Sequence, residues 1–494
     1  MLRLLLRGMS RRTSSVAAQR TRAVGRHLMS TSASSAEESV LFESNSSLRQ
    51  YILNRPHKLN ALDSNMLELL RPKIEEWNRS ELTGTIVGTG NGRAFCAGGD
   101  VAGVPIIPKA VVENAANAET RPQAIEYFKQ EFEMDYILAA LEKPYVAILD
   151  GITMGGGVGL ASGALFRVAT EKTVFAMPET KIGYFPDVGG SYYLSRLDGE
   201  VGTYLALTGD VLKGRAVFEH GLATHYIPSR RVPLLLQRLA ELDKPSPSVI
   251  DSTIEEFSSE SSEDETKTTL IGARRSAIDS VFRHNEVESI FADLVQLTSH
   301  EDESVKTWAS STVHQLNERS PTSLKVSLAA IRRGKKLELR EALNLELNVA
   351  AAFCGEVTSD FQKGVNKVLI SREGGRPDWS PSTVSEVSQE TVDKFFDPSS
   401  TYQLDIPDTL QPPSASRYFD YALPTEEEIG SAVMGSHVNA GDMGATAEEI
   451  IALFERLRPG KQGIREKVQE VLQRRCTLVD NADGNFVWLK WIHN

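Results

Sequence analysis

Cysteine is scarce in this 494-residue chain, which contains only Cys96, Cys354 and Cys476. The three are far apart and form no C-x-x-C pair, so the pattern excludes a disulfide framework and a cysteine-based zinc site. It fits a protein that works in a reducing compartment. Long apolar runs are also missing, because no stretch reaches the roughly 20 residues that a membrane-spanning helix needs. We therefore predict no membrane span.

Several catalytic signatures are absent as well. G-x-S-x-G is not met, since Ser191 is followed by Tyr193 rather than by a glycine at that position, and there is no P-loop or H-E-x-x-H. The segment 157–159 imitates a dinucleotide fingerprint, but Ser162 occupies its last glycine position, which disfavours a nicotinamide site. The net charge of −12 argues against nucleic-acid binding over the whole surface. We predict no cofactor, no metal and no direct nucleic-acid motif.

Acidic residues are missing from the start of the chain, where Glu37 is the first. Seven arginines precede it, interleaved with leucine, serine, threonine and alanine. An Arg-rich, Ser-rich and acid-poor start is typical of a mitochondrial transit peptide, and a disordered basic tail is the alternative. We predict that residues 1–36 are a transit peptide, that ordered structure begins near Val40, and that the protein resides in the mitochondrial matrix.

Residues 40–250 alternate short apolar runs with helical periodicity. Leu48–Asn54 and Tyr145–Leu149 are strand-like, whereas Asp63–Trp77 and Arg121–Leu141 have apolar residues at helical spacing. Strands alternating with helices predict an α/β fold with a parallel or mostly parallel sheet.

The remainder of the chain differs in composition and periodicity. Residues 251–388 are predominantly helical by periodicity, and residues 389–494 begin as a proline-rich stretch typical of an extended, poorly self-packed arm. Two further helices are predicted, at 447–457 and 464–474. The last segment, 486–492, carries two tryptophans, which are costly to leave in water. We expect this extension to dock, either on the same molecule or on a partner.

Two glycine-rich turns each follow a predicted strand, at 92–100 and 151–157. Glycines let a ligand approach the backbone, and a helix N-terminus supplies unpaired N–H donors. Two such turns can direct two N–H groups at one oxygen, and losing one donor from such an oxyanion hole costs about 3 kcal/mol of barrier. Each turn also has a plainer explanation: close helix–sheet packing for 151–157, and an ordinary turn with Cys96 as a small buried residue for 92–100.

Two carboxylates, Glu179 and Asp187, follow these turns eight positions apart. In an apolar setting the charged form of Glu179 is disfavoured, which raises its pKa towards values useful for acid–base catalysis. Each has a plainer explanation, because Glu179 after Pro178 suits a helix start and Asp187 suits a helix cap. Backbone donors together with two acids predict acyl chemistry on a carbonyl.

These residues together resemble the crotonase (enoyl-CoA hydratase) superfamily. The resemblance spans roughly Val40 to Ser388 and is closest to its 3-hydroxyisobutyryl-CoA hydrolase branch. It implies an α/β spiral of ββα units with a helical C-terminal part, and acyl-CoA thioesters as substrates. The strings that carry it are Ala94–Asp100, Gly151–Gly159, Met177–Thr180 and Phe185–Gly190.

The resemblance also implies roles for individual residues. The thioester oxygen would meet the N–H groups of Ala97 and Gly156, and Glu179 would attack the thioester or activate water. Asp187 would hold the substrate 3-hydroxyl or assist the water, and Glu131 would line the acyl pocket.

Coenzyme A would lie near Lys58, Ala97 and Asp100. Hydratases carry a second catalytic glutamate where this chain has Gly159, so the resemblance favours hydrolysis of a β-hydroxy thioester over hydration. The expected activity is hydrolysis of 3-hydroxyisobutyryl-CoA in mitochondrial valine degradation, with 3-hydroxypropionyl-CoA as a second candidate substrate.

Two alternatives stay open. The extension at 389–494 lies outside the usual hydrolase, and a derived protein of the mitochondrial small ribosomal subunit, with or without activity, would account for it. An enoyl-CoA hydratase or isomerase is the other alternative.

Overall fold

The computed structural model describes residues 38–98, 117, 119–258, 270–355, 357–397, 402–410, 414–439, 444–480 and 487–492. Residues 40–494 belong to one compact unit. The predicted transit peptide at 1–36 and the predicted coenzyme A contact Asp100 lie outside the described residues.

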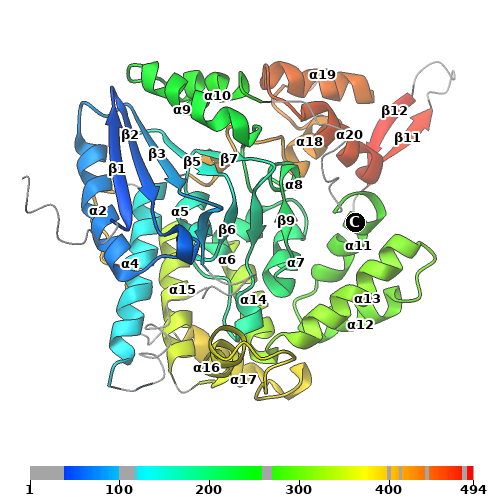
Figure 1. Ribbon diagram of the computed structural model, residues 1–494. Helices are drawn as coiled ribbons and strands as arrows, with labels where there is room; N and C mark the ends of the chain where they lie inside the picture. Colours follow the sequence, from blue (N-terminus) through cyan, green and yellow to red (C-terminus); the bar gives the residue numbers. More distant parts are fainter. Residues whose placement is uncertain are drawn as a thin grey trace, which may run out of the picture. The chain divides into compact units, whose positions relative to one another are not determined.

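Within the described residues, the larger sheet has six strands (Figure 1). Strand β1 pairs antiparallel with β2, and each later neighbour pairs parallel, as the alternation of strands and helices predicts. In spatial order the strands are β1 (Val40–Asn45), β2 (Leu48–Leu53), β3 (Thr85–Gly90), β5 (Tyr145–Leu149), β7 (Phe166–Ala169) and β10 (His225–Tyr226).

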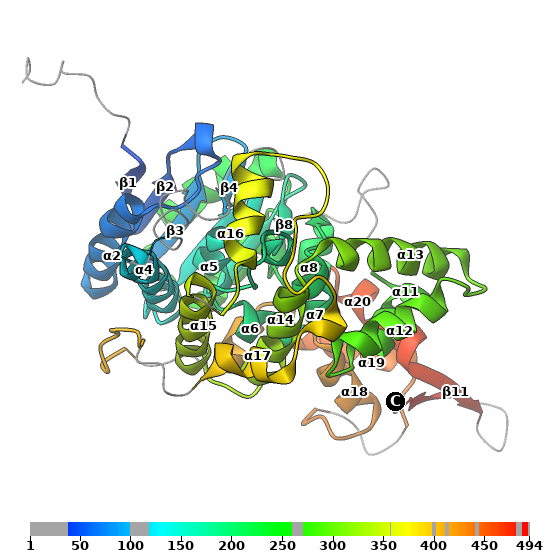
Figure 2. The same cartoon turned by 90° about the horizontal axis from the view of Figure 1, so that it is seen from below.

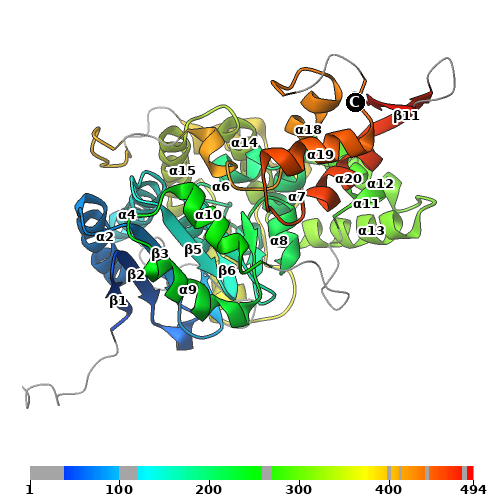
Figure 3. The same cartoon turned by 90° about the horizontal axis from the view of Figure 1, so that it is seen from above.

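Both faces of this sheet are covered by helices. Val146 and Ile148 belong to one apolar cluster with residues of α9 and α10, whereas Tyr145, Ala147 and Leu149 belong to another with residues of α2 and α4. Side chains alternate across a strand, so covering both faces explains why β5 is apolar throughout. Figure 3 shows α9 and α10 lying over the sheet. The helices of this part are α2 (Ser64–Arg79), α4 (Arg121–Ala139), α5 (Gly156–Ser162), α6 (Gly190–Tyr193), α7 (Val201–Thr208), α8 (Arg215–Glu219), α9 (Val232–Glu241) and α10 (Pro247–Glu255).

A smaller sheet supports the candidate site. Among the described residues it contains β4 (Ala94–Ala97), β6 (Ile152–Met154), β8 (Val174–Ala176) and β9 (Leu212–Lys213), in that order. Strands β4, β6 and β8 are parallel, so their carboxyl ends reach the same edge. The two glycine turns and Glu179 each follow one of these ends.

The part after residue 250 is built from helices, some of which begin with a side-chain cap. Asp302 accepts the N–H of Ser304 at 2.8 Å, and Ser320 accepts that of Ser323 at 3.1 Å. These helices are α11 (Gly272–Phe282), α12 (Val287–Leu297), α13 (Glu303–Glu318), α14 (Pro321–Gly334), α15 (Leu339–Cys354), α16 (Asp360–Gly364) and α17 (Gln389–Asp393). In the described part of the chain, no helix is both long and apolar enough to cross a membrane.

Short turns of 3₁₀-helix connect many of these elements. They are η2 (Pro56–Lys58), η3 (Glu179–Ile182), η4 (Leu194–Arg196), η5 (Ser229–Arg231), η7 (Val384–Glu386), η8 (Lys394–Phe396) and η9 (Ala415–Tyr418), and η6 (Val365–Ile370) is a π-helix.

The C-terminal extension folds onto the rest of the chain. Its helices α18 (Glu426–Val433), α19 (Ala447–Leu457) and α20 (Ile464–Arg475) precede the hairpin of β11 (Cys476–Asp480) and β12 (Val487–Trp491). Phe454 and Val468 belong to the same apolar cluster as the core. Nη2 of the buried Arg167 on β7 donates to the carbonyl oxygen of Tyr418 at 2.8 Å. The arm ahead of α18 packs against the core, where Leu404 and Ile406 are buried.

Candidate active site

The two glycine turns meet at the carboxyl ends of β4 and β6. The N–H of Gly98 donates to the carbonyl oxygen of Met154 at 2.8 Å. A Cβ added to Gly98 would lie 2.8 Å from the carbonyl oxygen of Met154 and 3.0 Å from the nitrogen of Gly156, so the turns fit together because residue 98 has no side chain.

The expected oxyanion donor Ala97 needs correction. Its N–H donates to the carbonyl oxygen of Leu59 at 2.8 Å, because the turn that carries Lys58 packs beside β4. This group is therefore not available to a thioester oxygen. The neighbouring N–H of Gly98 is likewise taken by Met154, so neither of these two N–H groups is free to bind the thioester oxygen.

Gly156 is better placed to receive an oxyanion. It is the first residue of α5, where N–H groups have no acceptor inside the helix. Gly155 before it has φ of 50° and ψ of −126°, a conformation that favours glycine. A Cβ on Gly156 would lie 2.2 Å from Oε1 of Glu131, so the Glu131 carboxyl group lies directly against this turn.

Glu179 begins η3 just after β8 and is only 1% exposed. Neither of its carboxyl oxygens has a hydrogen-bond partner within the described part of the chain. Burial raises the pKa of Glu179 from 4.5 to about 8, against the lowering effect of its own backbone N–H, and the nearby Glu131 raises it further. Such a carboxyl group is poised to exchange a proton near neutral pH.

Glu131 and Asp187 belong to the same buried group of acids. Burial raises the pKa of Glu131 to about 8, against a hydrogen bond from Tyr127 that lowers it. Burial also raises the pKa of Asp187 well above its usual value, and the charges of Glu131 and Glu179 add to this effect. The structure thus brings together Glu131, Gly156, Glu179 and Asp187, four of the sequence-predicted site residues.

Glu346 on α15 orders the loop that carries Asp187, and the sequence analysis missed it. Its Oε2 accepts the N–H of Gly189 at 2.7 Å, and its Oε1 accepts the N–H and the hydroxyl of Ser191 at 2.9 and 2.5 Å. Figure 2 shows α6, which contains Ser191, between α14 and α15. The available signal was a glutamate on the apolar face of a predicted helix, beside Leu343 and Leu347.

Asp135 is a second acid that the sequence analysis missed. It lies one helical turn after Glu131 on α4, and both its carboxyl oxygens are buried without a hydrogen-bond partner within the described residues. A Cβ on Gly159 would lie 2.5 Å from Oδ2 of Asp135. Asp135 therefore occupies the space beside Gly159, where hydratases carry their second glutamate. Burial raises its pKa well above the usual value.

Lys58 is exposed on η2, next to the Leu59 carbonyl that anchors β4. Asn60 holds this turn in place by donating from Nδ2 to the carbonyl oxygens of Asn91 and Ala94 at 2.9 and 2.8 Å. Coenzyme A binding by Lys58 and Ala97 stays a prediction.

Comparison with known proteins gives the same family. Residues 48–396 match the family model described as enoyl-CoA hydratase/isomerase. The chain is 40% identical to small ribosomal subunit protein mS47 of Neurospora crassa over 453 residues, covering 88% of this chain and 85% of that protein. It is 38% identical to the mitochondrial 3-hydroxyisobutyryl-CoA hydrolase of Homo sapiens over 379 residues, covering 76% and 93%.

A crystal structure of a carnitinyl-CoA dehydratase from Mycobacterium thermoresistibile aligns with a TM-score of 0.64 and 30% identity. The alignment covers 74% of this chain and 98% of that one. The predicted α/β crotonase fold is therefore confirmed. On the family match and these relatives, the chain belongs to the enoyl-CoA hydratase/isomerase family, the crotonase superfamily, and is closely related to the 3-hydroxyisobutyryl-CoA hydrolases and to mS47.

Proposed function

We propose that this chain is a protein of the mitochondrial small ribosomal subunit that retains the acyl-CoA hydrolase site of its family. The length of the sequence match to mS47 supports the assignment to the ribosomal subunit. Residues 1–388 make up less than four fifths of the 494-residue chain, so the match to mS47 over 88% must include part of the extension. The human hydrolase aligns over 93% of its own length yet covers only 76% of this chain.

The retained acids support the enzymatic part. We propose that the site hydrolyses a β-hydroxy acyl-CoA such as 3-hydroxyisobutyryl-CoA to the free acid and coenzyme A. The ionised carboxylate of Glu179 either accepts a proton from water while the water oxygen adds to the thioester carbon, or itself adds to that carbon and forms an anhydride that water then hydrolyses. In both routes the C–S bond breaks, and coenzyme A leaves as the thiolate and takes up a proton. The N–H of Gly156 stabilises the negative charge on the thioester oxygen. Asp187 and Glu131 surround the acyl group and its 3-hydroxyl.

Hydration of an enoyl-CoA is the weaker alternative. It requires two acids that deliver water across a double bond, and Gly159 provides no side chain for the second one. The nearby Asp135 carboxyl group projects from α4 instead of α5, so it approaches the site from a different direction.

An activity assay tests the proposed hydrolase activity, and a fractionation tests the proposed place in the ribosomal subunit. We expect purified protein to release free thiol from 3-hydroxyisobutyryl-CoA and to leave the enoyl absorbance of crotonyl-CoA unchanged. We expect the tagged full chain in mitochondria to sediment with the small ribosomal subunit. Absence of thiol release would overturn the hydrolase assignment, and sedimentation only with free proteins would overturn the ribosomal one.

A further inference from the structure

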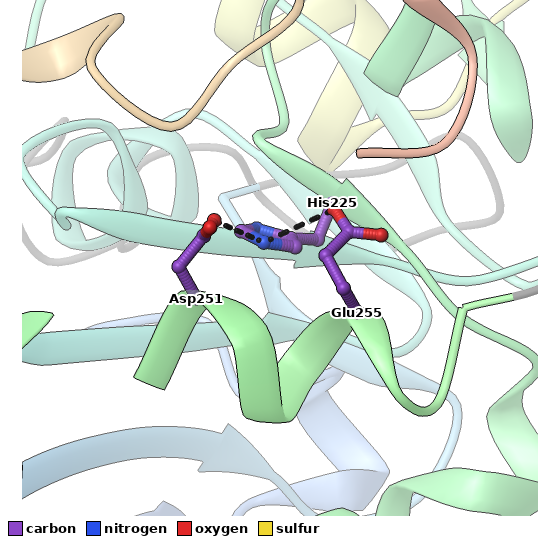
Figure 4. Close-up of side chains that lie close together, drawn as sticks. All are labelled: His225, Asp251 and Glu255. Atoms are coloured by element: carbon purple, nitrogen blue, oxygen red, sulfur yellow. Dashed lines mark hydrogen bonds and ion pairs between the residues drawn. The ribbon is translucent and has the colours of Figure 1, made fainter. Parts of the chain in front are cut away.

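Three potential metal ligands converge on the face of the sheet opposite α2 and α4. His225 lies on β10, and Asp251 and Glu255 lie one turn apart on α10, so that both acids point toward the imidazole (Figure 4). Nε2 of His225 lies 3.0 Å from Oδ1 of Asp251 and 3.4 Å from Oε1 of Glu255. We call these three residues the acid–imidazole tripod.

The two distances from Nε2 of His225 to the acids, 3.0 and 3.4 Å, are close to those between ligands of a zinc ion. Ligands about 2.0 to 2.2 Å from a tetrahedral zinc ion lie about 3.3 to 3.6 Å from one another, and histidine with carboxylates is a common ligand set. The three ligand atoms of the tripod all lie within 4.8 Å of one another. Nδ1 of His225 is 2.9 Å from the Thr224 hydroxyl, which orients the ring so that Nε2 faces the acids.

A cation from the extension already occupies this position. Lys461, between α19 and α20, places Nζ 2.8 Å from Oε1 of Glu255 and 3.8 Å from Oδ1 of Asp251. Its side chain is only 3% exposed, although a buried ammonium group is costly unless it is paired.

We propose that the acid–imidazole tripod is a latent zinc-type site, and that Lys461 fills it in place of a divalent cation. The ammonium group and a metal ion compete for the same carboxylates, so only one can be present. Filling the site from within the chain ties the turn between α19 and α20 to α10. It thereby holds the extension on the core, independently of whether the core hydrolyses thioesters or the chain joins a ribosome.

Removal of the ammonium group tests this proposal. In the full-length chain, Lys461→Met keeps the length of the side chain and removes its charge. We expect the variant to bind one Zn²⁺ at least ten times more tightly than the wild type, measured by competition with a chromogenic chelator. Zn²⁺ should also raise the melting temperature of the variant more than that of the wild type. The double variant Lys461→Met/His225→Gln should lose this gain, which separates the tripod from adventitious sites.

Three results would overturn the proposal. The first is equal Zn²⁺ affinity in the wild type and in Lys461→Met, and the second is a gain that persists in the double variant. The third result applies if Lys461→Met does not fold by itself. Zn²⁺ added during refolding should then restore the folded protein, and no restoration by Zn²⁺ would contradict a tripod that can bind a metal. Restoration of Lys461→Met by Zn²⁺, without restoration of the double variant, supports the proposal.

Discussion

Glu131 and Gly156 are in contact, since Oε1 of Glu131 would lie 2.2 Å from a Cβ on Gly156. Only glycine at 156 allows this carboxyl group to lie beside the proposed oxyanion donor. The atom that must move is the end of a flexible side chain, so substitution here tests the site more than the fold.

Gly156→Ala should therefore keep the fold and displace the Glu131 carboxyl group. We expect thiol release to fall about 100-fold, the loss that a misplacement of about 1 Å causes in catalytic geometry. Gly374→Ala is the matched control, because a Cβ there meets nothing within 4 Å and its activity should be unchanged. Equal activity in Gly156→Ala and Gly374→Ala would show that hydrolysis does not depend on the contact between Glu131 and Gly156.

Glu179→Gln should remove the proposed base or nucleophile while preserving side-chain volume. We expect thiol release from 3-hydroxyisobutyryl-CoA to fall about 100- to 10,000-fold. Glu68→Gln, at an exposed position on α2, should retain full activity. Thermal unfolding of both variants would verify the fold, and full turnover by Glu179→Gln would remove this residue from the mechanism.

The rate of hydrolysis should rise with pH. The pKa of Glu179 is raised from 4.5 to about 8, so at pH 7 most of the free enzyme holds this carboxyl group protonated and inactive as a base. kcat/KM should increase from pH 6 and level off above about pH 8. A profile that is flat across this range would contradict a base or nucleophile with a raised pKa.

Stability should change in the opposite direction. Between pH 4.5 and about 8 the native Glu179 keeps a proton that the unfolded chain has released, so the free energy of unfolding falls as pH rises. Urea unfolding at pH 5 and pH 8 measures the difference, which should be smaller in Glu179→Gln. An unchanged difference would assign the pH dependence to other buried acids.

Glu346→Ala should disorder the loop that carries Asp187. It leaves the N–H groups of Gly189 and Ser191 without their acceptor, which costs about 1–3 kcal/mol for each buried group left unsatisfied. We expect lower unfolding free energy and lower kcat, with Glu346→Gln intermediate because it keeps one acceptor oxygen. Wild-type kcat in Glu346→Ala would show that Asp187 is positioned without this glutamate.

Removal of residues 399–494 should destabilise the core. The deletion uncovers Arg167 and Phe166 on β7, whose partners Tyr418 and Tyr421 belong to the extension, and it leaves Asp198 without Lys467. We expect a lower melting temperature and poor solubility in the truncated chain. A truncated chain as stable as the full one would make the extension an independent attachment.

The sequence predicted the long elements well because periodicity and capping act locally. Helix α19 spans the predicted 447–457, and β5 spans the predicted 145–149. Asp63 caps α2 by accepting the N–H of Met66 at 3.0 Å. The strands β4, β6 and β8 were missed, since three or four residues are too few for a period to show. The β11–β12 hairpin was missed because it depends on pairing rather than on composition.

At the site, motif residues were more predictable than their surroundings. Glu131, Gly156, Glu179 and Asp187 lie near one another in the structure, and the roles that the resemblance implies for them stay predictions. The Ala97 bond to Leu59, by contrast, depends on how one turn packs beside another strand. Asp135 and Glu346 reach the site from helices distant in sequence. The position of Glu346 on the apolar face of its helix indicates a buried acid, but it does not indicate which loop that acid contacts.

The contact between Asp135 and Gly159 restricts how this fold can acquire a hydratase's pair of acids by mutation. A glutamate introduced at 159 would meet the Asp135 carboxyl group at once, because even a Cβ there lies within 2.5 Å of it. The change on α4 would have to come first or arrive together with it. An ordered two-step path therefore separates a chain that carries this Asp135–Gly159 contact from a site with the hydratase pair of acids.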